Sequence, residues 1–341
     1  MGGLFGQLFT KLTLPPASAI DGRTVLITGG NTGLGREAAR HALALGAATV
    51  ILGVRNLSKG DEAKADIESS TGNSGKNKVL VWPIDLESFS SVQVFAERVR
   101  NYVVAENGRL DMAIMNAGIA STMWAVTPDG WERHLQINVL STALLSLKLL
   151  PLLCQTAERH PQDAQRPHLV LVTSDSHESV KFSERTADRI FPVLNDRDEW
   201  ARSQKSGGPI ERYGVSKLMA ILVTEEIARL APGAAQGDPL VVVNSVAPGF
   251  CKSDLLTRES VPWILKVIEA LVARTAPEGS KTLLDGATRG VTSHGMWLEN
   301  QAITRPGKLV NDPNEAAYKE KVWKEILEIL RRVDPELGTE Y

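Results

Sequence analysis

Tyr213 and Lys217 lie four positions apart at the start of an apolar stretch, Leu-Met-Ala-Ile-Leu-Val, that is typical of a helix. This spacing puts both side chains on one face of a helix. A free tyrosine has a pKa of about 10, and a neighbouring ammonium should lower it, so the pair could exchange a proton with a substrate oxygen. Ser174 ends a separate apolar run, and its hydroxyl could hydrogen-bond that oxygen as negative charge develops.

A second group of residues has the pattern of a phosphate-binding turn. Residues 28–35 read Thr-Gly-Gly-Asn-Thr-Gly-Leu-Gly, between a strand-like run at Thr24–Thr28 and a helical stretch at Gly33–Leu45. A helix N-terminus binds phosphate, and glycines let the backbone approach a pyrophosphate. Glycines also mark ordinary turns, but the flanking strand and helix favour phosphate binding. The expected dinucleotide ligands here are Gly29, Asn31, Thr32, Gly33, Leu34 and Gly35.

The end of the next strand-like run indicates which dinucleotide binds. An NAD site usually has an acid at this point, whereas here Arg55 follows the run Thr49–Gly53 and no acid occurs before Asp61. An arginine can bind a 2′-phosphate through two hydrogen bonds, so the pattern favours NADP(H), although a solvated surface arginine would look the same. Residues after the third and fourth strand-like runs complete the expected site or serve as plain turns: Asp85, Leu86, Asn116, Ala117 and Gly118.

Short apolar runs alternate with longer helical stretches along most of the chain. Consecutive apolar residues suit strands of a parallel sheet that is covered on both faces. We therefore expect an α/β fold of Rossmann type, a doubly wound parallel sheet of about seven strands with helices on both faces. The expected strands are Thr24–Thr28, Thr49–Gly53, Lys78–Pro83, Leu110–Met115, Leu169–Thr173, Val241–Ser245 and a weakly patterned Gly307–Val310.

One domain over residues 21–341, after an apolar tail at 1–20, is the expected organisation, because no Pro/Gly-rich linker divides the chain. Residues 177–212 form an insertion between Ser174 and Tyr213 that should shape substrate choice, and residues 250–341 should cover the substrate. The helical pattern Glu315–Val333 is expected to pack on the sheet edge. Four tryptophans could line an apolar pocket or simply pack in the core or on the surface: Trp124, Trp131, Trp200 and Trp263.

Composition argues against several classes of function. A formal net charge of −2 does not suit a general nucleic-acid binder. The two cysteines, Cys154 and Cys251, make neither a disulfide scaffold nor a metal-binding pattern, so we expect no metal and a reducing compartment. The apolar start is too short to span a bilayer. We expect a cytoplasmic protein without an integral membrane segment, in which the tail packs on the body, forms a lid or touches a membrane surface.

The motifs, taken in chain order, resemble those of the short-chain dehydrogenase/reductase superfamily. They are the turn at residues 28–35, Asn116-Ala117-Gly118, Asn138, Ser174, Tyr213-x-x-x-Lys217 and Pro248-Gly249, within roughly residues 20–255. Each motif is weak alone, but the ordered set is specific. Val54-Arg55, Ser174-Asp-Ser-His177 and the residues before Tyr213 look most similar to the retinol-dehydrogenase and WW-domain-oxidoreductase branch, which includes fungal members.

The resemblance implies a role for each matched residue. Tyr213 would be the general acid or base, Ser174 would orient the substrate oxygen, and Lys217 would bind the nicotinamide ribose and lower the tyrosine pKa. Asn138 would hold a water that links Lys217 to solvent. Pro248 and Gly249 would border the nicotinamide, and Ser253 stands where many members have a threonine that contacts the cofactor.

The expected activity is NADP(H)-dependent hydride transfer between the nicotinamide and a carbonyl or alcohol of a lipophilic, polycyclic or secondary-metabolite small molecule. A non-redox isomerase, dehydratase or cyclase that keeps the cofactor is the alternative. A third hypothesis is a binding protein that senses the cofactor. A pure binding protein would not need the four candidate catalytic residues, which are all present: Asn138, Ser174, Tyr213 and Lys217. Monomer and homodimer both remain open.

Overall fold

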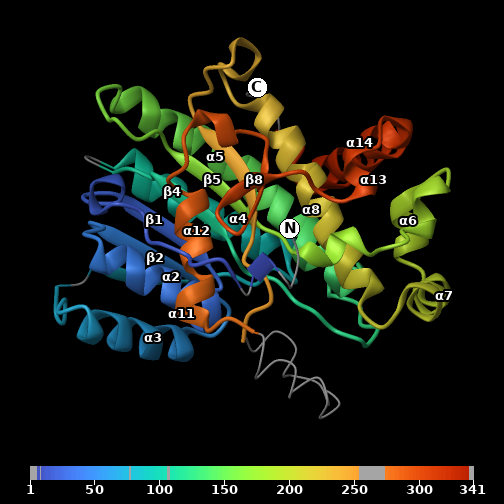
Figure 1. Ribbon diagram of the computed structural model, residues 1–341, viewed down its shortest axis with the longest axis horizontal. Helices are drawn as coiled ribbons and strands as arrows, with labels where there is room; N and C mark the ends of the chain where they lie inside the picture. The colour runs from blue at the N-terminus through green and yellow to red at the C-terminus, as the bar shows by residue number, and fades with distance from the viewer. Residues whose placement is uncertain (1–5, 8, 77, 106–107, 253–272, 338–341) are drawn as a thin grey trace.

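The computed structural model describes residues 6–7, 9–76, 78–105, 108–252 and 273–337, and its centre is one eight-stranded sheet (Figure 1). The strand order is β3-β2-β1-β4-β5-β6-β7-β8, and only the pair β7–β8 is antiparallel. The order reverses between β1 and β4, which is where ligands bind in open α/β sheets. The strands are β1 Thr24–Thr28, β2 Thr49–Val54, β3 Val79–Pro83, β4 Met112–Met115, β5 His168–Val172, β6 Val242–Ala247, β7 Trp297–Glu299 and β8 Ala302–Thr304.

Helices cover both faces of this sheet. Val25 and Ile27 of β1 belong to one apolar cluster with α2, α3 and α12, while Leu26 between them faces the other cluster with α4, α5 and α8. Successive strand residues point to opposite faces, so a fully buried strand needs an apolar residue at nearly every position. The longer helices are α2 Gly33–Ala44, α3 Leu57–Ser70, α4 Phe89–Val104, α5 Thr142–Arg159, α8 Glu211–Leu230 and α14 Ala316–Val333, and the shorter ones are α6 Ile190–Leu194, α7 Arg197–Gly207, α11 Ala276–Gly279, α12 Lys281–Gly286 and α13 Lys308–Asn311.

The predicted Rossmann-type α/β fold is confirmed, but the predicted seventh strand is wrong. Residues 308–311 form helix α13, and the seventh and eighth strands lie earlier, inside a stretch without a clear pattern. Each of these strands has three residues, too few to show alternation. The two residues between them, Asn300 and Gln301, have φ of 52° and 60°, as a two-residue hairpin turn requires. Neither is glycine, so the usual hairpin signal is missing.

The insertion and the C-terminal helix form one ordered unit beside α8. Figure 1 shows α6, α7, α13 and α14 gathered at the end of the molecule opposite α3. The prediction that the C-terminal helix packs on the sheet edge is wrong, because α14 packs on α6 and α8. Glu325 of α14 is 3% exposed and accepts hydrogen bonds from the N–H groups of Ile190 and Phe191 at 2.8 and 3.0 Å. Its carboxylate thus binds the start of α6, where N–H groups lack helical partners.

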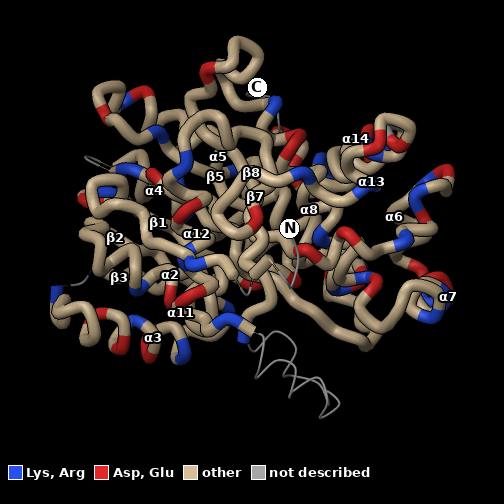
Figure 2. Tube along the Cα trace, in the orientation of Figure 1, with Lys and Arg blue, Asp and Glu red and all other residues tan. Residues whose placement is uncertain are grey.

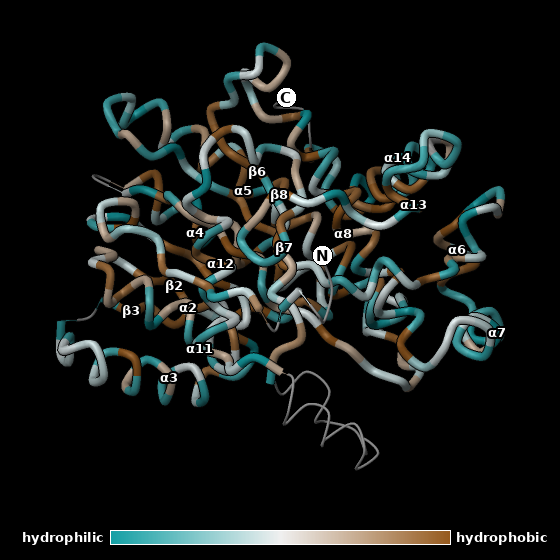
Figure 3. Tube along the Cα trace, in the orientation of Figure 1, coloured by the Kyte–Doolittle hydropathy of each residue, from teal (hydrophilic) through white to brown (hydrophobic). Residues whose placement is uncertain are grey.

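Charged and apolar residues are distributed as in a globular α/β protein. Acidic and basic residues are interspersed along α3 and α14 (Figure 2), and hydrophobic residues concentrate along the inner strands and α8 (Figure 3). Among the described residues, the helical stretch Leu135–Arg159 is long and apolar enough to cross a membrane, but 89% of its most apolar window is buried inside the structure. The core helix of a globular protein can be equally long and apolar. Because this stretch is buried inside the structure, we interpret it as a core helix.

Candidate active site

The turn between β1 and α2 requires glycine at three of its positions, 29, 33 and 35. Gly29 and Gly33 have φ of 68° and 53°, a region that favours glycine. A Cβ on Gly35 would lie 2.4 Å from the Gly29 carbonyl oxygen and 2.6 Å from the Asn116 amide nitrogen. The start of α2 therefore lies against the ends of β1 and β4. This cradle fits a dinucleotide pyrophosphate, and Asn31, Thr32 and Leu34 lie in the same turn.

The residues that follow β4 join this turn to the sheet. Asn116 donates its side-chain amide to the Thr28 carbonyl oxygen at 2.9 Å, and the Ala117 N–H donates to the Thr28 hydroxyl at 3.0 Å. A Cβ on Gly118 would lie 3.1 Å from Asn138 Oδ1 and 3.3 Å from Lys217 Nζ. The segment 116–118 thus lies between the dinucleotide cradle and the Tyr213–Lys217 helix.

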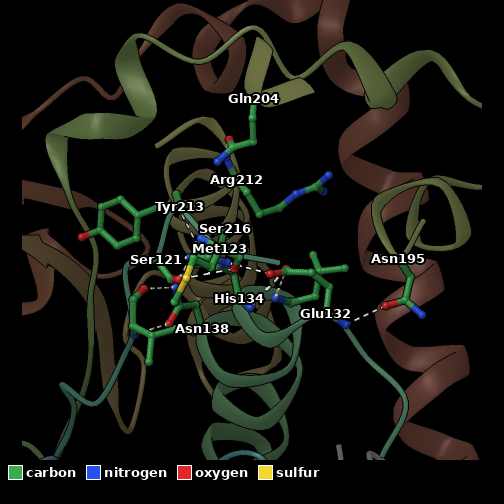
Figure 4. A network of polar contacts seen from close by, with 12 residues as sticks. Ser121, Met123, Glu132, His134, Asn138, Asn195, Gln204, Arg212, Tyr213 and Ser216 are labelled. Carbon is green, nitrogen blue, oxygen red and sulfur yellow. Dashed lines mark hydrogen bonds and ion pairs between the residues drawn. The ribbon is translucent and has the colours of Figure 1, made fainter. Parts of the chain in front are cut away.

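Asn138 holds the β4 loop against α8. It lies in a π-helical stretch, Leu135–Ser141, an irregularity that is common at functional sites. Its side chain accepts from the Ile119 N–H and donates to the Ile119 carbonyl and to the Ser216 hydroxyl, each at 2.9 Å. Ser216 in turn donates to the Tyr213 carbonyl at 2.7 Å. Figure 4 shows this chain of contacts running from the β4 loop to Tyr213.

Ser174, Tyr213 and Lys217 come together at the carboxyl edge of β5. The Lys217 ammonium lies 5.8 Å from the centre of the tyrosine ring, and the Ser174 side chain acts to lower the pKa of Tyr213. The Ser174 hydroxyl donates to the Asp175 carboxylate at 3.1 Å. Lys217 also donates to the Val172 carbonyl at 2.9 Å. Ser174 is held in turn, because His177 Nδ1 lies 2.6 Å from its carbonyl oxygen and the Ser176 N–H donates to its hydroxyl.

The electrostatics of this group differ from the sequence prediction. Burial raises the pKa of Tyr213 to about 12, against the opposing effect of the Ser174 hydrogen bond. Burial also lowers the pKa of Lys217 to about 8. The expected lowering of the tyrosine pKa by Lys217 is therefore absent here, because the ammonium lies over the ring and donates to Val172. Tyr213 stays protonated at neutral pH, which suits a proton donor.

Arg55 follows β2 as expected, but it already has an ionic partner. Its side chain is 56% exposed, and its Nη1 lies 3.0 Å from Glu87 Oε1. The same carboxylate oxygen lies 2.8 Å from Arg133 Nη2. Asp85 accepts from the Glu87 N–H at 3.0 Å, and Leu86 is buried in the core. The sequence prediction missed Glu87 and Arg133, although Glu87 directly follows the predicted Asp85-Leu86 pair.

Pro248 and Gly249 follow β6 and are contacted by two residues that the sequence prediction missed. Gly249 has a φ of 76°, and Arg274 donates to the Pro248 carbonyl at 3.1 Å. Gln7, from the N-terminal segment, lies so close that a Cβ on Gly249 would be 2.4 Å from its Oε1. Neither residue has a local sequence signal, because both come from distant parts of the chain. Ser253 and Trp263 lie outside the described residues.

A buried polar network lies behind Tyr213. Arg212 is fully buried and donates to Glu184 at 3.2 Å, while its Nε and Nη1 have no hydrogen-bond partner among the described residues. Figure 4 shows its side chain and the Tyr213 ring extending in different directions from α8. His134 accepts from the Ser121 N–H and faces Glu132 at 2.7 Å. The network fixes the start of α8, and with it the position of Tyr213.

The remaining predicted aromatic residues occur in edge-to-face pairs. Trp124 and Trp200 have ring centres 5.9 Å apart, and Trp131 and Phe191 have ring centres 6.1 Å apart. Trp200 comes from the insertion, and Trp124 comes from the loop after β4. The first pair therefore joins the insertion to a loop that begins at the dinucleotide cradle.

The sequence is similar to those of known proteins. Residues 23–176 match the family model described as short chain dehydrogenase. The short chain dehydrogenase atnD of Emericella nidulans is 43% identical over 297 residues, which cover 84% of this chain and 88% of atnD. The short chain dehydrogenase/reductase dmxR8 of a Cryptosporiopsis species is 36% identical over 338 residues and 98% of both chains. These names specify no branch, so the retinol-dehydrogenase-like assignment stays a prediction.

A solved structure, the Pseudomonas aeruginosa RhlG/NADP active-site complex, has a TM-score of 0.58 and 23% sequence identity. The alignment covers 84% of this chain and 97% of RhlG. At this identity the likeness concerns the fold alone. The family model and the two relatives show more: the chain belongs to the short-chain dehydrogenase/reductase family, whose members are oxidoreductases that use nicotinamide cofactors and act on small molecules.

Proposed function

We propose that the chain is an NADPH-dependent reductase that converts a lipophilic carbonyl compound into the corresponding alcohol. This proposal rests on the group Ser174, Tyr213 and Lys217, in which the Lys217 ammonium lies 5.8 Å from the centre of the tyrosine ring and burial raises the pKa of Tyr213 to about 12. Tyr213 is protonated at neutral pH and can therefore give its proton to the oxygen of a carbonyl that is being reduced. The RhlG complex contains NADP, and Arg55 is the residue here that would favour the same cofactor.

In the proposed mechanism the residues divide into those that hold the cofactor and those that serve the substrate oxygen. The turn at residues 29–35, Asp85-Leu86 and residues 116–118 would hold the adenosine and pyrophosphate, and Pro248-Gly249 would border the nicotinamide. The bound nicotinamide supplies a hydride to the carbonyl carbon. Ser174 orients the carbonyl oxygen, Tyr213 gives that oxygen its hydroxyl proton as negative charge develops, and Lys217 would hold the nicotinamide ribose through its ammonium.

The lipophilic substrate class rests on apolar residues of the insertion and of the loop after β4. The pair Trp124–Trp200 is accompanied by exposed apolar side chains, with Met123 64% and Ile210 43% exposed. Exposed apolar groups that cluster on a surface often mark binding sites. We therefore assign residues 177–212 and the covering region 250–341 to substrate recognition, within one domain over residues 21–341 that follows the tail at 1–20.

The proposed function is tested by NADPH consumption with a panel of carbonyl compounds of graded apolar size. We expect NADPH oxidation with stoichiometric alcohol formation, and kcat/KM that rises with apolar area. Equal rates across the panel would contradict the lipophilic substrate class. Substrate conversion without any change of NADPH would contradict a redox reaction and favour an isomerase or dehydratase.

Replacing Arg55 with Ala should lower the preference for NADPH over NADH, measured as the ratio of kcat/KM values, by about tenfold. The lost interaction is a charged hydrogen bond to the 2′-phosphate, but Arg55 is 56% exposed and screening by solvent keeps the loss modest. Arg100→Ala removes an equally exposed arginine from α4 and should leave the ratio unchanged. A wild type that prefers NADH, or an Arg55→Ala variant with an unchanged ratio, would overturn the assignment.

A further inference from the structure

The N-terminal segment is bound along the cofactor side of the protein at three places. Gln7 contacts the loop after β6, as described above. Leu12 is 1% exposed, its N–H donates to Glu278 at 3.2 Å, and its carbonyl accepts from Lys281 at 3.1 Å. Thr13 exchanges two hydrogen bonds with the Gln301 side chain, at 2.9 and 2.7 Å. This pattern describes an ordered strap rather than a loose tail.

The Gln7 contact is the most specific of the three. Its carboxamide accepts from the Phe250 N–H at 2.7 Å and donates to the Phe250 carbonyl at 2.9 Å, as a neighbouring strand would do. Gln7 is 5% exposed, so water does not replace either bond. Arg274 completes the enclosure, because its guanidinium donates to both the Gln7 and the Pro248 carbonyl oxygens. Two distant parts of the chain therefore fix the conformation of residues 248–250.

This loop lies beside the expected cofactor site. It leaves β6, whose neighbour β5 ends at Val172, the residue that receives the Lys217 hydrogen bond. Next in the loop is Cys251. A Cβ on Gly279 would be 2.4 Å from Cys251 Sγ and 2.9 Å from Leu34 of the glycine-rich turn, so the loop and that turn meet at Gly279. A shift of the loop after β6 would therefore change the space between this loop and the glycine-rich turn.

We propose that Gln7 is a positioning residue of the cofactor site, and that its two bonds to Phe250 and its contact with Gly249 set the loop that borders the nicotinamide. The proposal rests on the proposed function for where the nicotinamide lies. Gln7 is not one of the residues assigned above to holding the cofactor or serving the substrate oxygen. It acts through the loop, and it links the N-terminal segment to the cofactor site.

The test compares two ligands that differ only in the nicotinamide ring, NADPH and 2′-phospho-ADP-ribose. Gln7→Met keeps the length of the side chain and its packing on Gly249, but removes both hydrogen bonds to Phe250. It should weaken NADPH binding by about tenfold, since a buried N–H and a buried carbonyl lose their partner. Binding of 2′-phospho-ADP-ribose should stay within about twofold of wild type, because that ligand does not reach the loop.

Gln301→Met is the matched control, because it removes two hydrogen bonds from the same strap at Thr13, away from residues 248–250. It should leave both affinities unchanged. Gln7→Glu keeps the acceptor for the Phe250 N–H but turns a carboxylate oxygen toward the Phe250 carbonyl oxygen, so it should weaken NADPH binding at least as much as Gln7→Met, and it serves if Gln7→Met does not fold.

The outcomes separate this inference from the proposed function. A wild type that binds neither ligand contradicts the proposed function. A wild type that binds both, with Gln7→Met binding NADPH equally well, contradicts the role of Gln7 alone. Equal weakening of both ligands by Gln7→Met, or by Gln301→Met, would show a general structural effect and would also overturn the positioning role.

Discussion

Replacing Tyr213 with Phe should lower kcat for carbonyl reduction by about 10²–10⁴-fold and leave NADPH binding nearly unchanged. The substitution removes one hydroxyl and keeps the ring that packs under Lys217. Without that hydroxyl, the alkoxide that forms at the substrate carbon has no positioned proton donor. Steady-state turnover and equilibrium binding of NADPH, measured on the same preparations, separate the two effects.

Tyr102→Phe provides the matched control, because it removes the same atom from α4, where the hydroxyl donates to Thr49 at 3.3 Å. Its turnover should stay within about twofold of wild type. Near-normal turnover in Tyr213→Phe would mean that Tyr213 only packs at the start of α8, and the catalytic assignment would then be withdrawn. A loss of NADPH binding equal to the loss of rate would instead indicate a damaged site.

Much of the fold was predictable because its signals are local. Each of the first six strands is a short apolar run, and a strand buried on both faces needs such a run. The last two strands were missed because three residues carry no period, and because Asn300 and Gln301 adopt a positive φ without a glycine. A hairpin of that kind is defined by its pairing with β6, which no local pattern records.

The candidate site was predictable to the extent that each motif places a residue at the end of one strand. Parallel strands bring those ends to one edge, so Gly35, Asn116 and Ser174 gather without any contact being specified in the sequence. Gln7 and Arg274 could not be predicted in this way. Gln7 is 243 positions from Phe250 in the loop after β6 and Arg274 is 26 positions from Pro248, and glutamine or arginine in a segment without a motif predicts no partner.

The pKa of Tyr213 is the second property that could not be predicted from the sequence. The four-residue spacing of Tyr213 and Lys217 predicts proximity, which the structure has, and a lowered tyrosine pKa, which it does not have. Proximity on a helix does not determine burial or the direction of a hydrogen bond. Here burial outweighs the neighbouring charge, because Lys217 donates to Val172 rather than to the tyrosine hydroxyl.

Replacing Lys217 with Met should lower kcat/KM with NADPH by about 10²–10³-fold and should also remove one limb of the pH profile. Methionine keeps an unbranched apolar stem but carries no ammonium. Burial lowers the pKa of Lys217 to about 8, so the ammonium is present below that pH and is lost above it. In wild type, kcat/KM for reduction should therefore fall as the pH rises through about 8. Tyr213, with a pKa of about 12, remains protonated over that range.

The pH profile of Lys217→Met decides which group titrates. If Lys217 is responsible for the falling limb, the variant should show a low and flat kcat/KM across that range, while the control Lys324→Met, an exposed lysine on α14, should keep both the rate and the limb. A falling limb that persists near the same pH in Lys217→Met would assign the titration to another group. A limb that starts only near the pKa of Tyr213 in wild type would mean that the Lys217 charge is not needed for reduction, and that Tyr213 acts with Ser174 alone.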